Sequence, residues 1–201
     1  MKGIILFLII TICLQSWTKA DDIGEFQIEG MSIGDSALQY LSKNQILDEI
    51  EFTKDHYIFL KEPLKFREVY IFDIDDSSNY DKISFMVKQK DPNYKIYFLR
   101  GMKTFNNQFD KCINQRNKIA NKIEKLFINY EKDEYELKNA LDKSGKSFRI
   151  QIRFTFNSGD VITVGCSDWN EELRKKNKWT EGLNVALITN EIVEWFDQKK
   201  Y

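Results

Sequence analysis

A pair of alternating segments in the second half of the chain constrains the fold more than any other feature. Between residues 148 and 156, apolar and polar side chains alternate without interruption. The apolar positions are Phe148, Ile150, Ile152, Phe154 and Phe156. This period of two is typical of a strand with one buried face. Residues 157–160 include Asn and Gly, which tolerate a tight turn, and Ile162, Val164 and Cys166 alternate after them. The pattern predicts a β-hairpin with Cys166 on its buried face.

Residues 1–20 have the pattern of a secretory signal peptide. Lys2 supplies a positive charge, residues 4–14 form an apolar run, and Ala20 provides the small residue at a cleavage site. The run is shorter than the roughly 20 residues of a membrane-spanning helix, and bulky Ile12 before Cys13 argues against lipid attachment. We expect a signal peptide over 1–20, the alternatives being an uncleaved anchor or a short buried strand.

The remaining residues, 21–201, are enough for one domain with a sizeable core, or for two small lobes. The chain has 30 basic and 31 acidic residues and a formal net charge of −1. This balance gives no general attraction to nucleic acid or to anionic membranes. Two prolines and no low-complexity segment indicate no linker. We predict a single domain over 21–201, with no nucleic-acid partner and no membrane span after cleavage.

Two cysteines, Cys112 and Cys166, remain once Cys13 leaves with the signal peptide. An even pair in an oxidising compartment is typical of a disulfide. Apolar side chains at spacings of three and four over residues 107–128 predict a long helix with Cys112 on its buried stripe. Because the helix face and the hairpin face each carry a cysteine, we predict a Cys112–Cys166 disulfide. The alternative is two buried free thiols.

The other elements complete an α+β pattern. Alternation predicts strands at 26–28, 57–60, 67–74, 82–89, 94–100 and 184–189, with a turn at 91–93 in an antiparallel meander. Capping signals predict helices that begin after Ser32, Ser42 and Ser167, and a last helix spans 191–198. The stretch before residue 140 is interpreted as helical. The fold expected is an antiparallel sheet, meander plus C-terminal hairpin, packed by one long helix and several short ones.

Residues 140–147 match a relaxed phosphate-binding loop in which Ala stands for the first Gly. Such a loop needs a strand before it and a helix after it, so that backbone amides and the helix N-terminus meet the phosphates. The predicted order here is a helix followed by a strand. We therefore interpret the segment as a solvated loop and expect no nucleotide cofactor.

Residues 73–81 place oxygen-bearing side chains at alternate positions, as a calcium loop does. They are Asp73, Asp75, Ser77, Asn79 and Asp81. Ser78 stands where the loop needs Gly, and Ser84 stands where it needs a bidentate Glu. Two interpretations stay open, a weak calcium site and an acidic turn between strands. No metal-ligating residue is assigned.

No complete catalytic constellation is present in the sequence. His56 is the one histidine, so a multi-histidine metal site is excluded and a Ser-His-Asp triad depends on it. A nucleophilic Cys166 would need His56 as its base, whereas a disulfide explains both cysteines. A basic run at 174–178, near Trp169 and Trp179, favours either a ligand or partner surface or a solvated helix end. We assign no catalytic or cofactor-binding residue.

Three motifs carry a resemblance to a known group of proteins. They are EGMSIGDS at 29–36, SGKS at 144–147, and SGD with CSDW between 158 and 169. With the signal peptide, the chain resembles over nearly its whole length an uncharacterised family of small exported bacterial proteins. That family has no known activity, so the resemblance implies no functional residue. The junction at 30–32 is also similar to small modules of outer-membrane assembly lipoproteins and to β-lactamase-inhibitor-like domains, which implies only a helix packed on a sheet.

These observations favour a non-enzymatic binding or interaction module of the cell envelope, periplasmic or secreted. Its partner would be another envelope protein or a small ligand. The alternative is a small periplasmic hydrolase that uses acidic residues. A pocket with convergent carboxylates of perturbed pKa would favour the hydrolase, and an exposed apolar patch or aromatic groove would favour binding.

Overall fold

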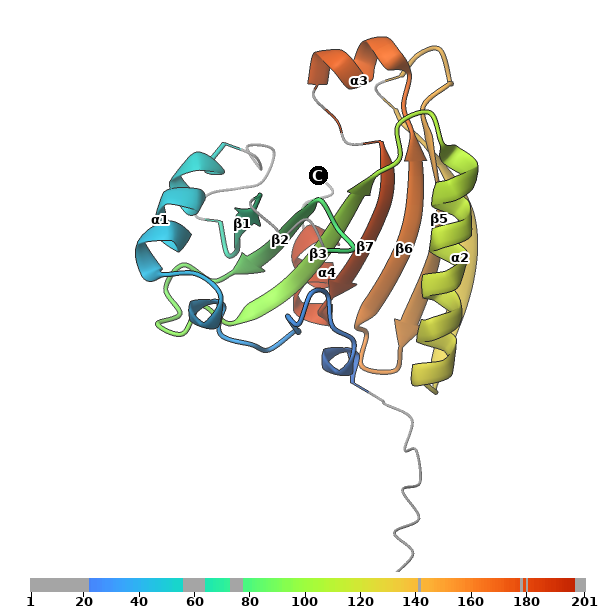
Figure 1. Cartoon of the computed structure of the whole chain (residues 1–201). Helices are drawn as coiled ribbons and strands as arrows, with labels where there is room; N and C mark the ends of the chain where they lie inside the picture. The colour runs from blue at the N-terminus through green and yellow to red at the C-terminus, as the bar shows by residue number, and fades with distance from the viewer. Residues whose placement is uncertain are drawn as a thin grey trace, which may run out of the picture.

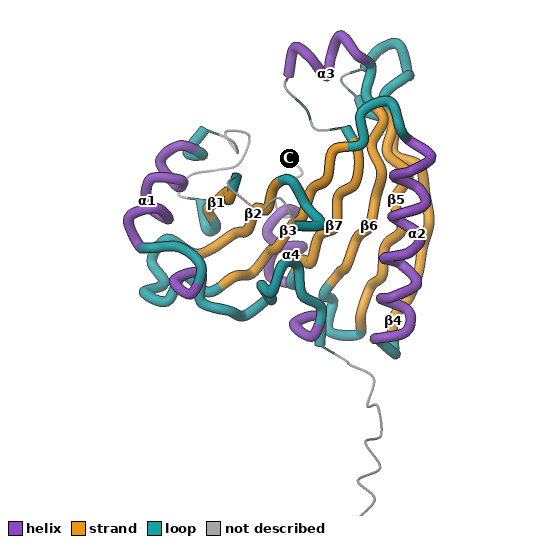
Figure 2. The backbone as a smooth tube through the Cα atoms, in the orientation of Figure 1, coloured by secondary structure: helices purple, strands orange, loops and turns teal. Residues whose placement is uncertain are grey.

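The protein folds around one antiparallel sheet with helices on both faces (Figure 1, Figure 2). The computed structural model describes residues 22–55, 64–72, 78–140, 142–177, 179 and 181–197. Within them the sheet has seven strands in the order β1-β2-β3-β7-β6-β5-β4. The strands are β1 Arg67–Ile71, β2 Lys82–Val87, β3 Ile96–Thr104, β4 Tyr130–Lys138, β5 Phe148–Phe156, β6 Val161–Asp168 and β7 Gly182–Ile188. The helices are α1 Lys43–Phe52, α2 Phe109–Leu126, α3 Glu171–Asn177 and α4 Asn190–Asp197. The predicted α+β class is confirmed.

The predicted hairpin is the pair β5 and β6, with Ile150 opposite Cys166. Gly159, at φ 84°, makes the turn between them. Helix α2 lies along this part of the sheet (Figure 1), and the Cys112–Cys166 disulfide joins the two with a Cα–Cα distance of 6.0 Å. Both the pairing and the buried position of Cys166 are therefore confirmed.

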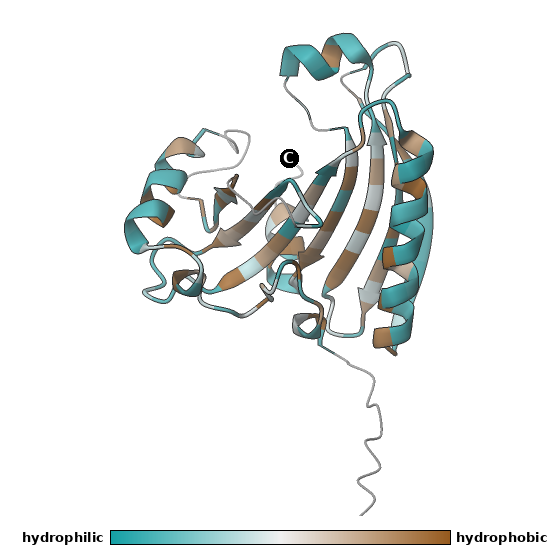
Figure 3. Cartoon of the chain, in the orientation of Figure 1, coloured by the Kyte–Doolittle hydropathy of each residue, from teal (hydrophilic) through white to brown (hydrophobic). Residues whose placement is uncertain are grey.

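The two faces of the sheet are covered unequally. The N-terminal segment, α1 and α2 cover one face and bury the larger core with it, including Ile28, Ile46, Ile123 and Phe154. Figure 3 shows apolar bands on the strands and a polar outer surface on α2. On the opposite face the short helix α4 packs against the sheet and closes a second, smaller core. That core contains Phe66, Met86, Phe98, Ala186, Ile192 and Trp195.

The rest of that second face is polar, and we call it the open face. We define it by side chains from four adjacent central strands. They are Arg100 and Met102 on β3, Asn184 on β7, Thr163 and Ser167 on β6, and Arg149, Gln151 and Arg153 on β5.

Several predicted elements are confirmed with small shifts. The antiparallel meander is β1, β2 and β3. Its turn is closed by the Tyr94 N–H, which donates to the Asp91 carbonyl at 3.1 Å. The capping box at Ser42 forms as predicted and begins α1. None of the described helices is long and apolar enough to span a membrane.

Two helix predictions are wrong. The stretch before residue 140 forms strand β4, because it pairs with β5 along its whole length. The helix expected after Ser32 is only a single 3-10 turn, Ala37–Gln39, capped by Ser36. Asp35 accepts from the Ser32 N–H at 2.8 Å, but Gly34 at φ 93° breaks the helical path.

Two smaller expectations also need correction. Residues 26–28 form no extended strand, because Ile28 makes only an isolated bridge to Met31. Ser167 does not begin α3, because it belongs to β6. The α3 cap is Asn170, whose side chain accepts from the N–H groups of Glu172 and Leu173 at 3.1 and 3.3 Å. The signal peptide, His56, the strand at 57–60 and residues 73–77 lie outside the described residues.

Candidate functional site

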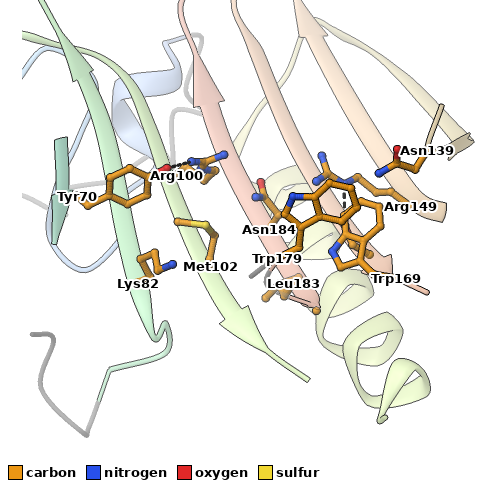
Figure 4. Close-up of a pocket in the computed structure, with 12 residues that line it drawn as sticks. Tyr70, Lys82, Arg100, Met102, Asn139, Arg149, Trp169, Trp179, Leu183 and Asn184 are labelled. Carbon is orange, nitrogen blue, oxygen red and sulfur yellow. Dashed lines mark hydrogen bonds between the residues drawn. The ribbon is translucent and has the colours of Figure 1, made fainter. Parts of the chain in front are cut away.

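The open face contains two adjoining hollows, of about 320 and 440 Å³. Arg100, Arg149 and Asn184 line both of them, and Figure 4 shows these side chains around the first. Trp169 and Trp179 border the first hollow, and Phe196 of α4 borders the second. The hollows therefore form one continuous surface across the centre of the sheet.

The strand register explains why the sheet is hollow at this point. Met102, Asn184, Gly165 and Gln151 lie opposite one another on the adjacent strands β3, β7, β6 and β5. Gly165 thus leaves the middle of this row without a side chain. A Cβ added there would stand 3.2 Å from Arg149 Cδ, so the arginine side chain lies over the glycine. In this way Arg149 extends from β5 across β6.

Arg149 is fixed at its stem and free at its end. Its Nε donates to Ser167 Oγ at 2.9 Å, and its Cζ lies 5.9 Å from the centre of the Trp169 ring. Within the described part of the chain, its terminal nitrogens donate no hydrogen bond and no carboxylate pairs with it. Burial, followed by the nearby charge of Arg100, lowers the pKa of Arg149. An anion bound to the terminal nitrogens of Arg149 would neutralise its charge and accept their hydrogen bonds.

Arg100 is held from the other side of the hollows. Its Nη2 donates to Glu68 Oε1 at 2.6 Å and to the Tyr70 hydroxyl at 3.3 Å. Its Nε donates to Ser84 Oγ at 3.0 Å. Glu68 is only 2% exposed, and burial raises the pKa of Tyr70 to about 12. Arg100 therefore has a fixed orientation before any ligand arrives.

Positive charge exceeds negative charge on this surface. Lys82, Arg100 and Arg149 line the first hollow, and Arg153 joins the last two in the second. Neither hollow is lined by a described Asp or Glu. Of these four cations, Arg100 is paired with a carboxylate, that of Glu68. Among the described residues, the other three have no carboxylate partner.

The two tryptophans form an aromatic wall beside Arg149. Their ring centres are 5.2 Å apart at an interplanar angle of 56°. Trp169 follows β6, while Trp179 follows α3, where its N–H donates to the Arg174 carbonyl at 3.1 Å. Trp179 therefore lies beside Trp169 at the first hollow (Figure 4), while α3 itself lies beyond the ends of the strands (Figure 1).

The described residues of the basic run, 174–177, do not line the two hollows of the open face. Arg174 Nε lies 3.6 Å from Glu181 Oε2, and Lys175 Nζ lies 2.7 Å from Glu171 Oε1. The cations that face the hollows come from the strands, and Arg149 and Arg153 occupy polar positions of the alternating segment 148–156. The presence of two arginines on the same face of one predicted strand was the sequence signal that could have indicated this site. Trp169 and Trp179, which lie near that run in sequence, both line the first hollow.

A third hollow, of about 570 Å³, is acidic and lies beside the first turn of α2. Asp110, Asp168 and Glu181 line it. Burial, then the charge of Glu181, raises the pKa of Asp168. Glu181 is itself engaged, because Oε1 accepts from the Asn107 N–H at 3.0 Å. This is the one place in the described chain where a lining carboxylate has a raised pKa.

The motif-like loops have structural roles. Residues 140–147 join two strands, and the Asp142 carboxylate accepts from Ser144 Oγ at 2.6 Å and from the Ser147 N–H at 2.7 Å. In the calcium-like segment, Asn79 donates to Glu29 and Asp81 accepts from the Thr104 N–H. The described residues contain no cluster of three or more groups that could hold a metal ion.

Comparison with known proteins gives no relative. No family model matches the chain, and neither the curated proteins nor the solved structures contain a match.

Proposed function

We propose that this protein is a non-enzymatic binding protein of the cell envelope, periplasmic or secreted, whose ligand occupies the open face. The observation that carries the proposal is Arg149, a half-buried guanidinium whose terminal nitrogens bind no described residue. Burying an arginine without a partner anion costs stability. Ser167 and Gly165 nevertheless hold it in place. A bound ligand is the simplest compensation for that cost.

The surface also has the size and composition of a ligand site. Small-molecule sites are concave, are lined by apolar and aromatic groups with a few polar ones, and occupy about 300–1,000 Å³. The first hollow, of about 320 Å³, combines the Trp169–Trp179 wall with Arg149 and Asn184. Both arginines are anchored in advance, so little conformational entropy is lost when a ligand binds.

The proposed location is supported by the disulfide. Disulfides persist in oxidising compartments and are rare in the cytosol. The Cys112–Cys166 bond agrees with export directed by the predicted signal peptide at 1–20. It also agrees with the resemblance to small exported bacterial proteins.

Purification of the exported protein tests the proposal. The full chain would be expressed in a bacterium and recovered from the periplasmic fraction, with its N-terminus sequenced. Native mass spectrometry should then detect a small molecule retained from an envelope extract. Arg149→Gln should release it, whereas Lys132→Gln should not, because Lys132 Nζ bonds to Glu124 of α2 away from the open face. A cytoplasmic product, or an empty protein after incubation with the extract, would contradict the proposal.

The acidic hollow favours a second candidate, a small hydrolase. A general acid needs a raised pKa, and burial together with Glu181 raises the pKa of Asp168. Screening the purified protein against ester, glycoside and phosphoester substrates would test this function. Turnover that Asp168→Asn abolishes and Arg149→Gln leaves intact would favour the hydrolase over the binding protein.

A further inference from the structure

We infer that the open face binds a small molecule in which a carboxylate or phosphate is attached to a flat ring. This inference rests on the proposed binding function and specifies its ligand. The acidic group would lie against Arg149 and Arg100, and the ring would lie against Trp169 and Trp179.

The anionic half of the ligand follows from Arg149. A guanidinium presents its N–H groups as a planar fork that matches the paired oxygens of a carboxylate or phosphate. Nε of Arg149 is used by Ser167, which leaves the two terminal nitrogens for the ligand. The Trp169 ring at 5.9 Å and the glycine beneath restrict how the fork can turn.

Arg100 strengthens the preference for an anion. Its charge contributes to the lowered pKa of Arg149, so the two cations repel each other across the hollow. A negative group placed between them would be attracted by both. Asn184 lines the same hollow and lies between the two arginines in Figure 4, where its amide offers a further donor.

The ring half follows from the position of the aromatic wall. Arg149 Cζ lies 5.9 Å and the Trp179 ring centre lies 5.2 Å from the centre of the Trp169 ring, so an acid held by Arg149 has indole surface close by. Flat rings gain from offset or edge-to-face contacts with indole beyond the area they bury. Met102 and Leu183 add apolar surface to the same hollow.

A small ligand fits better than a macromolecule. The two hollows lie between α4, which covers β3 and β7, and the α3 segment that carries Trp179. The formal net charge of −1 offers no long-range attraction for a polyanion. Lys82, Arg100, Arg149 and Arg153 line the hollows themselves, where they favour a single acidic group.

Isothermal titration calorimetry of the full exported protein with three matched probes tests the inference. The probes are naphthoate, naphthyl phosphate and naphthalenemethanol, which share a ring and differ in the charged group. At least one acid should bind roughly tenfold or more tightly than the alcohol, because a charge-assisted pair is lost with the alcohol. The tighter of the two acids identifies whether the natural ligand is a carboxylate or a phosphate.

Variants of Arg149 distinguish the contribution of its planar guanidinium from the contribution of its positive charge. Arg149→Gln should lower affinity for the acid to that for the alcohol, and Arg149→Lys should restore only part of it. Lys132→Gln also removes one positive charge, but away from the open face, and should change affinity less than twofold. Thermal denaturation shows whether each variant is folded. If a variant does not fold, the comparison of the three probes on the unaltered protein still tests the inference.

Each outcome has a distinct meaning. Equal affinity for acid and alcohol, or an acid affinity that Arg149→Gln leaves unchanged, would overturn the inference while leaving a binding protein. Retention of an envelope molecule by a protein that binds none of the probes would also overturn the inference alone. A protein that binds neither the probes nor any envelope molecule would overturn the proposed function with it.

Discussion

The Arg149 side chain lies directly over Gly165 of the neighbouring strand, where a Cβ would stand 3.2 Å from Arg149 Cδ. This contact positions the guanidinium above the centre of the sheet. A glycine in a strand interior weakens the strand and often marks a close approach by another group. Here that group is the arginine on which the proposed ligand site depends.

Gly165→Val should weaken binding of an acidic ligand about tenfold, because the added methyl groups displace Arg149 from its place over β6. Stability should change little, since valine suits a strand. Calorimetry with naphthoate and urea denaturation measure the two effects. Unchanged affinity in a folded Gly165→Val protein would show that the position of Arg149 over β6 is unimportant.

Glu68→Gln should separate stability from binding. Glu68 is 2% exposed and pairs with Arg100 at 2.6 Å, so loss of its charge should lower the free energy of unfolding by about 2 kcal/mol. The same change raises the positive charge near the hollows and should tighten acid binding severalfold. Urea denaturation and calorimetry would show the two opposite shifts. Glu171→Gln, which breaks an exposed pair with Lys175, should leave both the urea midpoint and binding nearly unchanged, because the pair is screened by solvent.

The Cys112–Cys166 disulfide should account for a large part of the stability. It closes a loop with a sequence separation of 54, which is worth about 4 kcal/mol in the chain-entropy model. Reduction should therefore lower the urea midpoint. A Cys112→Ser, Cys166→Ser double variant should have the same midpoint as the reduced protein, and reductant should not change it. Two free thiols in the exported protein, found by mass spectrometry under non-reducing conditions, would contradict both the bond and the location argument.

Local patterns were enough to predict the hairpin and its cysteine. The alternation over residues 148–156 records one buried and one exposed face, and the turn residues lie beside it in sequence. Strand β4 was not predicted, because charged side chains occupy both its faces and it lies at the edge of the sheet. Charge is typical of edge strands, where it discourages pairing with other chains. Its strand conformation comes from pairing with β5, which is not a local property.

The candidate site was hidden for a related reason. Arg100 and Arg149 share a hollow only because β7 and β6 lie between their strands in the sheet order. The sequence shows that Arg149 lies on the polar face of its strand, but it does not show which strands are its neighbours in the sheet. Trp169 and Trp179 lie close together in sequence and near the basic run 174–178, whereas Arg100 and Arg149 are far apart in sequence.

The loop between β4 and β5 should make stability depend on pH through Asp142. Hydrogen bonds from Ser144, then from Ser147, hold the pKa of this carboxyl well below its usual 3.8. Because the folded-state pKa is depressed, the stabilisation is fully present above the unfolded pKa and is lost as the pH falls toward the folded pKa. Asp142→Asn should therefore be less stable than the unaltered protein at pH of about 7, with the difference shrinking below a pH of about 4. Urea midpoints across this range measure the effect, and a difference that stays constant with pH would show that the carboxylate charge does not stabilise the loop.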